Sequence, residues 1–160
     1  MKKLYSDTLL AGWKARAKKY LFSAAGCLLA GLLVCIMLCT RVNTGNADAL
    51  LFAVIALATV TGWMAMLLLY FGYAPARAQC GHIQGILEGS TEEYTGEMHV
   101  LGEKIHIPKS VDMCKVALKC GEETKTFNVN SVLMDNLPAN GAQVRVQIVR
   151  NFITAYEVTA

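Results

Sequence analysis

Charged residues are scarce in this sequence and are missing altogether from two long stretches. They make up 17% of the 160 residues, 54% of the residues are hydrophobic, and the mean hydropathy is +0.39. No charge lies between Lys19 and Arg41 or between Asp48 and Arg77. Because a surface helix in water carries a polar face, these stretches exclude an ordinary soluble domain over this part of the chain.

The motifs of common catalytic and nucleotide-binding sites are also missing. The sequence has no phosphate-binding loop, dinucleotide fingerprint, Gly-x-Ser-x-Gly or His-Glu-x-x-His. The acidic cluster of the sequence consists of Glu88, Glu92, Glu93 and Glu97. It lies in a segment rich in Ser, Thr and Gly, which we interpret as a solvated loop. Loops often carry function, so residues 89–96 are the best candidate contact surface. We expect no catalysis and no cofactor.

The six cysteines lack the spacing of a disulfide framework or a zinc site. Three lie in the first apolar stretch, three follow the second, and none forms Cys-x-x-Cys. Reduced thiols in a cytosolic domain are the simplest account. His99 and His106 are seven residues apart, which places them on opposite faces of one continuous strand. We therefore expect no metal site.

Cys80 and His82 are the only neighbouring cysteine and histidine in the sequence that could act together as metal ligands or in catalysis. In a β-strand the two side chains would share one face and would be weak candidates for metal ligands or for a cysteine nucleophile. A juxtamembrane Cys80 can alternatively be acylated. No orienting third group is identifiable, so an enzyme that uses this pair is only an alternative reading.

The uncharged stretches predict a hairpin of two transmembrane helices over residues 20–73. The helices are expected at about 21–40 and 49–72, and each reaches the roughly 20 residues that span a bilayer core. The first stretch is longer than the apolar part of a signal peptide, and a second follows at once, so we expect a retained anchor. The helices contain no Asp, Glu, Lys, Arg or His, which disfavours a pump or transporter.

The charge distribution predicts the orientation of the chain. Six Lys or Arg precede the first span and one lies in the loop between spans, so the positive-inside rule places both termini in the cytoplasm of a two-span cell-membrane protein. Residues 78–160 carry seven Lys or Arg against ten Asp or Glu. Because nucleic-acid binding needs a basic face on the soluble domain, we expect no nucleic-acid partner.

Residues 1–19 form a basic cytoplasmic segment with two interpretations. In the first, residues 6–19 form an amphipathic helix that starts at Ser6 as the N-cap and lies on anionic lipid headgroups. In the second, they form a frayed basic tail whose only role is to set the orientation of the first span in the membrane. The residues expected at the membrane surface are Trp13, Lys14, Arg16, Lys18 and Lys19.

Small residues in the first helix predict how the hairpin packs. Gly26 and Ala30 lie four residues apart, and Gly31 belongs to a neighbouring stripe. Small side chains let another helix approach closely. Folding the hairpin about residue 44 places Trp63 opposite Gly26, so we expect an intramolecular contact there. Homo-oligomerisation through the small-residue stripe is the alternative.

Residues 78–160 predict a β-rich cytoplasmic domain that follows a helix ending at Pro75. A helical turn is expected over 131–136, tight turns at 121–123 and 150–151, and a turn at 101–104. Strands are expected over 114–120, 124–129, 144–148 and 152–158, with others over 82–87 and within 98–107. This pattern indicates a small antiparallel β-barrel, OB-like or Sm-like, or alternatively a two-layer sheet.

Two short segments are similar to membrane-protein families. Leu137–Val146 and the hairpin after it resemble the closing strands of NfeD-type proteins over about 25 residues. That resemblance implies an OB-like domain after transmembrane helices, with membrane proteases or scaffold proteins as partners. Residues 102–110 are similar to the β-domain of small-conductance mechanosensitive channels, which place a pore-lining helix directly before that domain. Here the small residues lie mainly in the first helix, which differs from that channel family. We assign the chain to neither family.

These observations lead to one expected function and two alternatives. We expect an integral membrane protein whose cytoplasmic barrel mediates protein–protein interaction or assembly, with the lipid bilayer and either another membrane protein or its own copies as partners. A homo-oligomeric channel or transporter subunit is the first alternative, since an uncharged pore can be gated hydrophobically. The enzyme that uses Cys80 and His82 is the second.

Overall fold

The computed structural model describes residues 1–43, 45–105 and 111–159. The chain forms two compact units: Met1–Trp13 together with Ala78–Ala160, and Lys14–Arg77. His106 and the second half of the segment similar to mechanosensitive channels lie outside the described residues.

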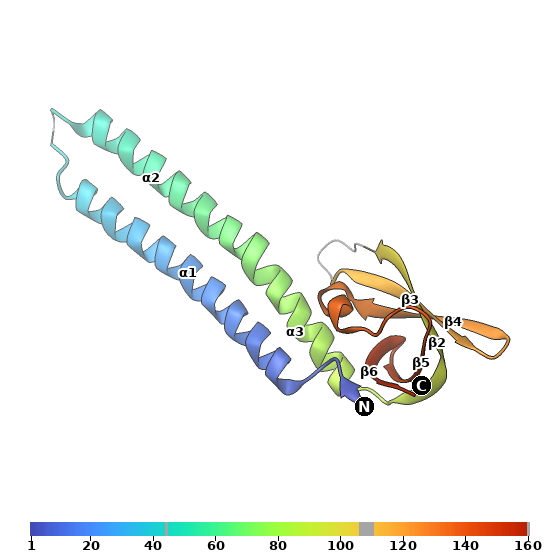
Figure 1. Cartoon of the computed structure of the whole chain (residues 1–160). Helices are drawn as coiled ribbons and strands as arrows, with labels where there is room; N and C mark the ends of the chain where they lie inside the picture. Colours follow the sequence, from blue (N-terminus) through green and yellow to red (C-terminus); the bar gives the residue numbers. More distant parts are fainter. Residues whose placement is uncertain (44, 106–110, 160) are drawn as a thin grey trace. The chain divides into compact units, whose positions relative to one another are not determined.

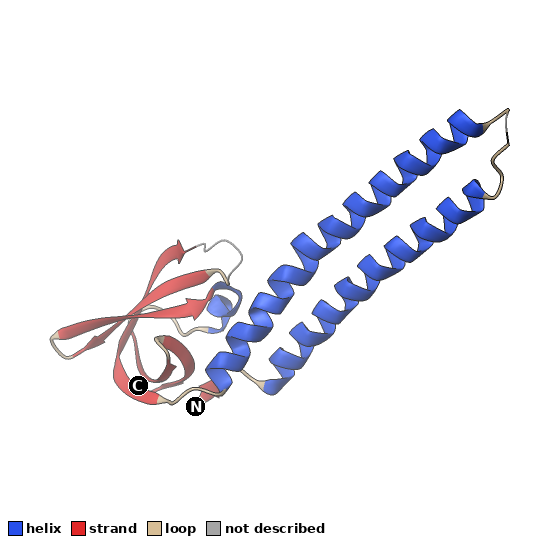
Figure 2. Cartoon of the chain, turned by 180° about the vertical axis from the view of Figure 1, so that it is seen from behind, coloured by secondary structure: helices blue, strands red, loops and turns tan. Residues whose placement is uncertain are grey.

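Two long helices form the second unit and lie side by side in antiparallel directions (Figures 1 and 2). Helix α1 runs without interruption over Asp7–Cys39, and α2 covers Ala47–Leu67. Both are long and apolar enough to cross a membrane. Their large side chains point outward, as with Phe22 at 73% and Phe52 at 75% exposure. The predicted two-helix hairpin is confirmed.

The second helix continues past Pro75, so its predicted end is wrong. A π-helical turn, η1 (Leu68–Tyr73), leads directly into α3 (Ala74–Leu87), and the Ala74 N–H bonds to the Leu69 carbonyl five residues back. Proline removes an N–H and its ring clashes with the carbonyl four residues earlier in a regular α-helix. The wider turn before Pro75 relieves that conflict and lets the helix continue.

The strand predicted over 82–87 is likewise the end of α3. Gln79, Ile83 and Ile86 are buried and follow the i, i+4, i+7 spacing of one helix face. Ile83 and Ile86 belong to the hydrophobic core of the first unit. A short apolar run does not distinguish a buried strand from a buried helix turn, and here packing decided for the helix.

Five strands close into a mixed β-barrel (Figure 1). Their bounds are β2 (Glu92–Ile105), β3 (Met113–Cys120), β4 (Glu123–Asn130), β5 (Ala142–Val149) and β6 (Phe152–Val158). The pairing order β6–β4–β3–β2–β5 returns to β6. The β4–β6 pair is parallel, whereas the other pairs of these strands are antiparallel. The predicted barrel is confirmed, but the parallel β4–β6 pair makes it mixed and not wholly antiparallel. The exchanged positions of β5 and β6 form an OB-like Greek key.

Several local predictions in the barrel are confirmed. The 3-10 helix η2 covers Ser131–Asn136, and the Asn130 side chain caps it by accepting from the Val132 N–H at 3.1 Å. Arg150 and Asn151 have φ of 49° and 69°. Positive φ at both central residues is the geometry that joins twisted strands in a two-residue hairpin.

Strand β2 departs from two predictions. It begins at Glu92 and pairs with β5, so only the first part of the expected 89–96 loop is a loop. The expected turn at 101–104 is a bulge, where the register with β3 shifts between Val100 and Lys104. Gly102 has a φ of +70° there, a conformation that glycine adopts without steric cost.

The first residues belong to the barrel and not to a free basic segment. Strand β1 (Lys2–Lys3) pairs with β6, and the Leu4 N–H donates to the Thr154 carbonyl at 2.8 Å. Leu4 and Tyr5 are buried in the core. The expected helix over 6–19 is the beginning of α1, and its predicted N-cap is confirmed by a 3.2 Å bond from the Leu9 N–H to Ser6 Oγ.

Candidate functional site

Cys80 and His82 lie on α3, so the expected shared strand face is wrong. Two residues apart in a helix point about 200° away from each other. The His82 ring makes edge contacts with Tyr5 and Phe152, at centroid distances of 5.8 and 4.6 Å. Its Nε2 lies 3.4 Å from the Tyr5 hydroxyl. Among the described residues, no group of three or more His, Cys, Asp or Glu is placed to hold a metal ion.

Burial sets the protonation of this aromatic cluster. It lowers the pKa of His82 from its ordinary value of 6.5. Burial also raises the pKa of Tyr5, and a backbone contact from Asn130 only partly offsets that effect. Low-polarity surroundings disfavour the charged form of each group. At neutral pH the two side chains are therefore an uncharged packing pair that joins α3 to the N-terminal segment.

A buried amide pair lies nearby at the junction of α3 and the barrel. Asn130 Nδ2 donates to Gln79 Oε1 at 2.7 Å. The Asn130 oxygen meanwhile caps η2, so both polar ends of one buried side chain are bonded. Because an unbonded buried amide is costly, this pair fixes how α3 docks on the barrel.

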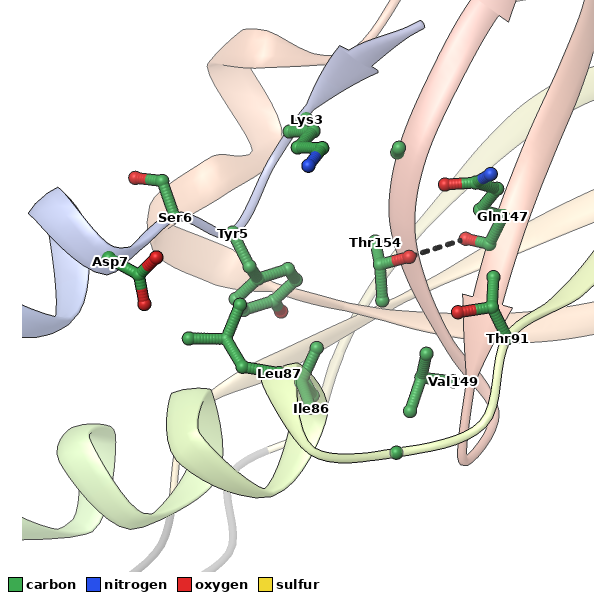
Figure 3. Close-up of a pocket in the computed structure, with 12 residues that line it drawn as sticks. Lys3, Tyr5, Ser6, Asp7, Ile86, Leu87, Thr91, Gln147, Val149 and Thr154 are labelled. Carbon is green, nitrogen blue, oxygen red and sulfur yellow. Dashed lines mark hydrogen bonds between the residues drawn. The ribbon is translucent and has the colours of Figure 1, made fainter.

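A pocket of about 260 Å³ opens on this unit between four chain segments (Figure 3). Its floor includes the buried side chains of Tyr5, Ile86 and Val149. Half of the lining residues are polar or charged. Within the lining, Thr154 Oγ1 donates to the Gln147 carbonyl at 3.0 Å. These polar residues are Lys3, Ser6, Asp7, Thr91, Gln147 and Thr154.

The sequence predicted only one side of this pocket. Gly89 and Thr91 line it and belong to the 89–96 segment that we expected to be a contact surface. The remaining lining comes from the N-terminus, the end of α3 and the β5–β6 hairpin. No local pattern links segments so far apart, and pairing of β1 with β6 assembles them.

Three residues of the acidic cluster, Glu92, Glu93 and Glu97, lie on strand β2 and not in the expected loop, whereas Glu88 follows α3. Glu88, Glu92 and Glu93 are exposed, as expected of solvated charges. Glu93 forms an ion pair with Arg145, and Gln147 Nε2 donates to Glu93 Oε1 at 3.0 Å. The Gln147 hydrogen bond first, and the Arg145 contacts second, lower the pKa of Glu93. Gln147 therefore connects this charged pair to the pocket.

The helices meet at Gly31, on the neighbouring stripe of small residues, and not at the expected pair of Gly26 and Trp63. Gly31 faces Thr61, and a Cβ built at Gly31 would lie 2.6 Å from Thr61 Cγ2. Gly26 has nothing within 4 Å of such a Cβ, Ala30 is exposed, and Trp63 is 64% exposed. The expected contact between Trp63 and Gly26 is therefore wrong.

The expected membrane-surface residues separate into two groups. Trp13 packs against the barrel core together with Leu9 and Leu10, and so does not lie free on a membrane surface. The exposed cations of α1 are Lys14, Arg16, Lys18 and Lys19. These four remain candidates for contact with headgroups.

Comparison with models of known protein families finds no match. Comparison with curated proteins finds none either.

Proposed function

We propose that this chain is a membrane-anchored interaction protein without catalytic activity. The helical hairpin anchors it in the cell membrane, and the barrel on the cytoplasmic side binds another membrane protein. The observation that carries the proposal is the pocket with the floor of Tyr5, Ile86 and Val149. Outward-facing apolar side chains on both helices and the Lys/Arg bias before the first span support the anchoring and its orientation.

The size and lining of the pocket favour a side chain of a protein partner as its occupant. Pockets for drug-sized ligands are about 300–1,000 Å³, and this one is about 260 Å³. Protein interfaces place an apolar anchor side chain in a central pocket and surround it with polar contacts. Lys3 and Asp7 supply charges of both signs at the lining, which suits a partner with paired polar groups beside an apolar anchor.

Pocket filling tests the proposal in the full-length chain. Thr91 is exposed and lines the pocket, so Thr91→Trp should fill it without disturbing the core. We expect purification in mild detergent to recover a distinct partner with the wild type and to lose it with Thr91→Trp. Thr124→Trp, at an exposed position of β4, is the matched control and should retain the partner.

Two outcomes would contradict the proposal. A partner that Thr91→Trp retains as well as the wild type does would show that the pocket is not the binding site. A discrete ring of identical chains, seen by intact mass, would favour the channel alternative instead.

A further inference from the structure

Two adjoining pockets lie between the helices of the hairpin unit. The first, of about 380 Å³, is lined by Ala15, Arg16, Lys19, Tyr20, Ser23 and Leu68. The second, of about 270 Å³, is lined by Tyr20, Met64, Leu67, Leu68, Phe71 and Gly72. Tyr20 and Leu68 belong to both linings, so the pockets are neighbours with a common wall.

The first pocket has the chemistry of an anion site. Arg16 and Lys19 bring two positive charges one helical turn apart, and Ser23 adds a hydroxyl. No acidic residue lies in the sequence between Asp7 and Asp48, so this length of the chain is basic. The planar guanidinium of arginine binds phosphate through two parallel hydrogen bonds, and lysine acts as a point charge.

The second pocket is apolar and owes its shape to the π-helical turn η1. Phe71 and Gly72 belong to that turn, and a Cβ at Gly72 would collide with the Tyr20 ring. Glycine therefore lets the Tyr20 ring lie against η1 as the wall between the pockets. Single π-helical turns are frequent at functional sites.

We infer that one phospholipid with an anionic headgroup occupies both pockets. Its phosphate binds Arg16 and Lys19, and an acyl chain follows Met64, Leu67 and Phe71. The apolar pocket beside the cations selects a lipid over a free phosphate, which would leave that pocket unfilled. Arg16 and Lys19 lie within about 8 Å, at 1.5 Å per helical residue, of the first apolar stretch at Leu21. Basic pockets at this depth between helices bind anionic lipid headgroups.

The inference rests on the proposed membrane anchoring and goes beyond it, because a bilayer anchor needs no specific lipid. It also assigns distinct roles to the basic residues of α1. Arg16 and Lys19 line the pocket, whereas Lys14 and Lys18 do not. General attraction to an anionic surface would use all four cations alike.

Native mass spectrometry of the full-length chain in detergent tests the site, with phosphatidylglycerol and phosphatidylcholine as competing probes. We expect the wild type to retain phosphatidylglycerol preferentially. Arg16→Gln with Lys19→Gln should lower that retention about tenfold or more, since each cation near an anionic surface contributes about 1 kcal/mol. The control pair Lys14→Gln with Lys18→Gln should change it less than about threefold. Ser23→Trp, which fills the pocket and keeps both cations, should also abolish the preference.

Equal losses in the two double variants would overturn the site, because they would indicate general surface attraction. Unchanged lipid selectivity in Ser23→Trp would overturn it as well. Alkaline extraction of membranes that contain the wild-type chain tests the membrane anchoring separately from the lipid site. A wild-type chain that stays in the membrane without lipid preference contradicts only the lipid site, whereas a chain released from the membrane contradicts both proposals.

Discussion

The surroundings of His82 favour its neutral form. It lies between the rings of Tyr5 and Phe152, and burial lowers its pKa from 6.5. A cation in this position would lose hydration and gain no charged partner from Tyr5, whose own pKa is raised by burial. Folding of the first unit therefore selects neutral His82.

This arrangement predicts that acid weakens the barrel. Unfolded His82 binds a proton near pH 6.5, whereas the folded side chain binds it only at lower pH. Between these values the unfolded state holds more protons, so the free energy of unfolding should fall as the pH drops below about 6.5. His82→Phe should reduce this dependence. Thermal unfolding can be followed by Trp13 fluorescence in a Trp63→Phe background, because Trp13 packs on the barrel core.

His99→Gln is the control for this pH dependence. The His99 side chain is 45% exposed and lies beside Glu97 on β2, away from the aromatic cluster. We expect this variant to keep the steep acid response of the wild type. If His82→Phe responds to acid as strongly as the wild type does, the loss of stability comes from other groups.

At the scale of the elements, α1 and α2 meet along one face of each helix. Gly31 lies against Thr61, and Cys27 Sγ and Cys35 Sγ lie 3.9 and 4.0 Å from the carbonyl oxygens of Thr61 and Val54. Close approach through a glycine increases van der Waals contact, which is the main source of helix association where lipid competes for apolar surface.

A matched pair of valine substitutions tests this face. Gly31→Val would place carbon atoms onto the Thr61 side chain, and overpacking of this kind costs about 1–3 kcal/mol. Gly26→Val enters open space and should leave the hairpin as stable as the wild type. Loss of helical circular dichroism during titration with a denaturing detergent measures both variants. A larger loss in Gly26→Val than in Gly31→Val would show that the helices meet on another face.

At the scale of the whole molecule, the barrel core draws on sequence from both sides of the apolar stretches. Leu9, Leu10 and Trp13 pack on it from the start of α1, and Ile83 and Ile86 pack on it from the end of α3. The barrel therefore includes residues that precede the hairpin and residues that follow it. A chain that begins at Ala78 would lack the part of the core that residues 1–13 contribute.

Cysteine labelling tests the proposed topology of the whole chain. Cys39 is exposed at the end of α1, and Cys120 is half-buried at the end of β3. In single-cysteine chains, a maleimide that cannot cross membranes should label Cys39 in intact cells and Cys120 only after permeabilisation. Labelling of Cys120 from outside would reverse the proposed orientation. Cys114 is fully buried and would report nothing in either case.

Local sequence patterns were sufficient for the elements whose partners lie nearby. Uncharged length alone predicted the two apolar helices, and alternation predicted β3 to β6 and the β5–β6 turn, because these patterns reflect burial of one face along a continuous segment. The Ser6 cap and η2 also depend on contacts within a few residues. All of these predictions are confirmed.

Only the tertiary structure decided the features that depend on distant partners. Residues 82–87 are helical because their apolar face packs on the barrel core, and Lys2–Lys3 form a strand because β6 offers an edge some 150 residues later. The contact of Gly31 with Thr61 and the three pockets also depend on distant partners. The sequence by itself determined which segments alternate as half-buried strands and which are long and apolar enough to cross a membrane, since hydrophobicity is a property of each segment. Which surfaces meet depended on packing between segments, and that packing forms the candidate sites.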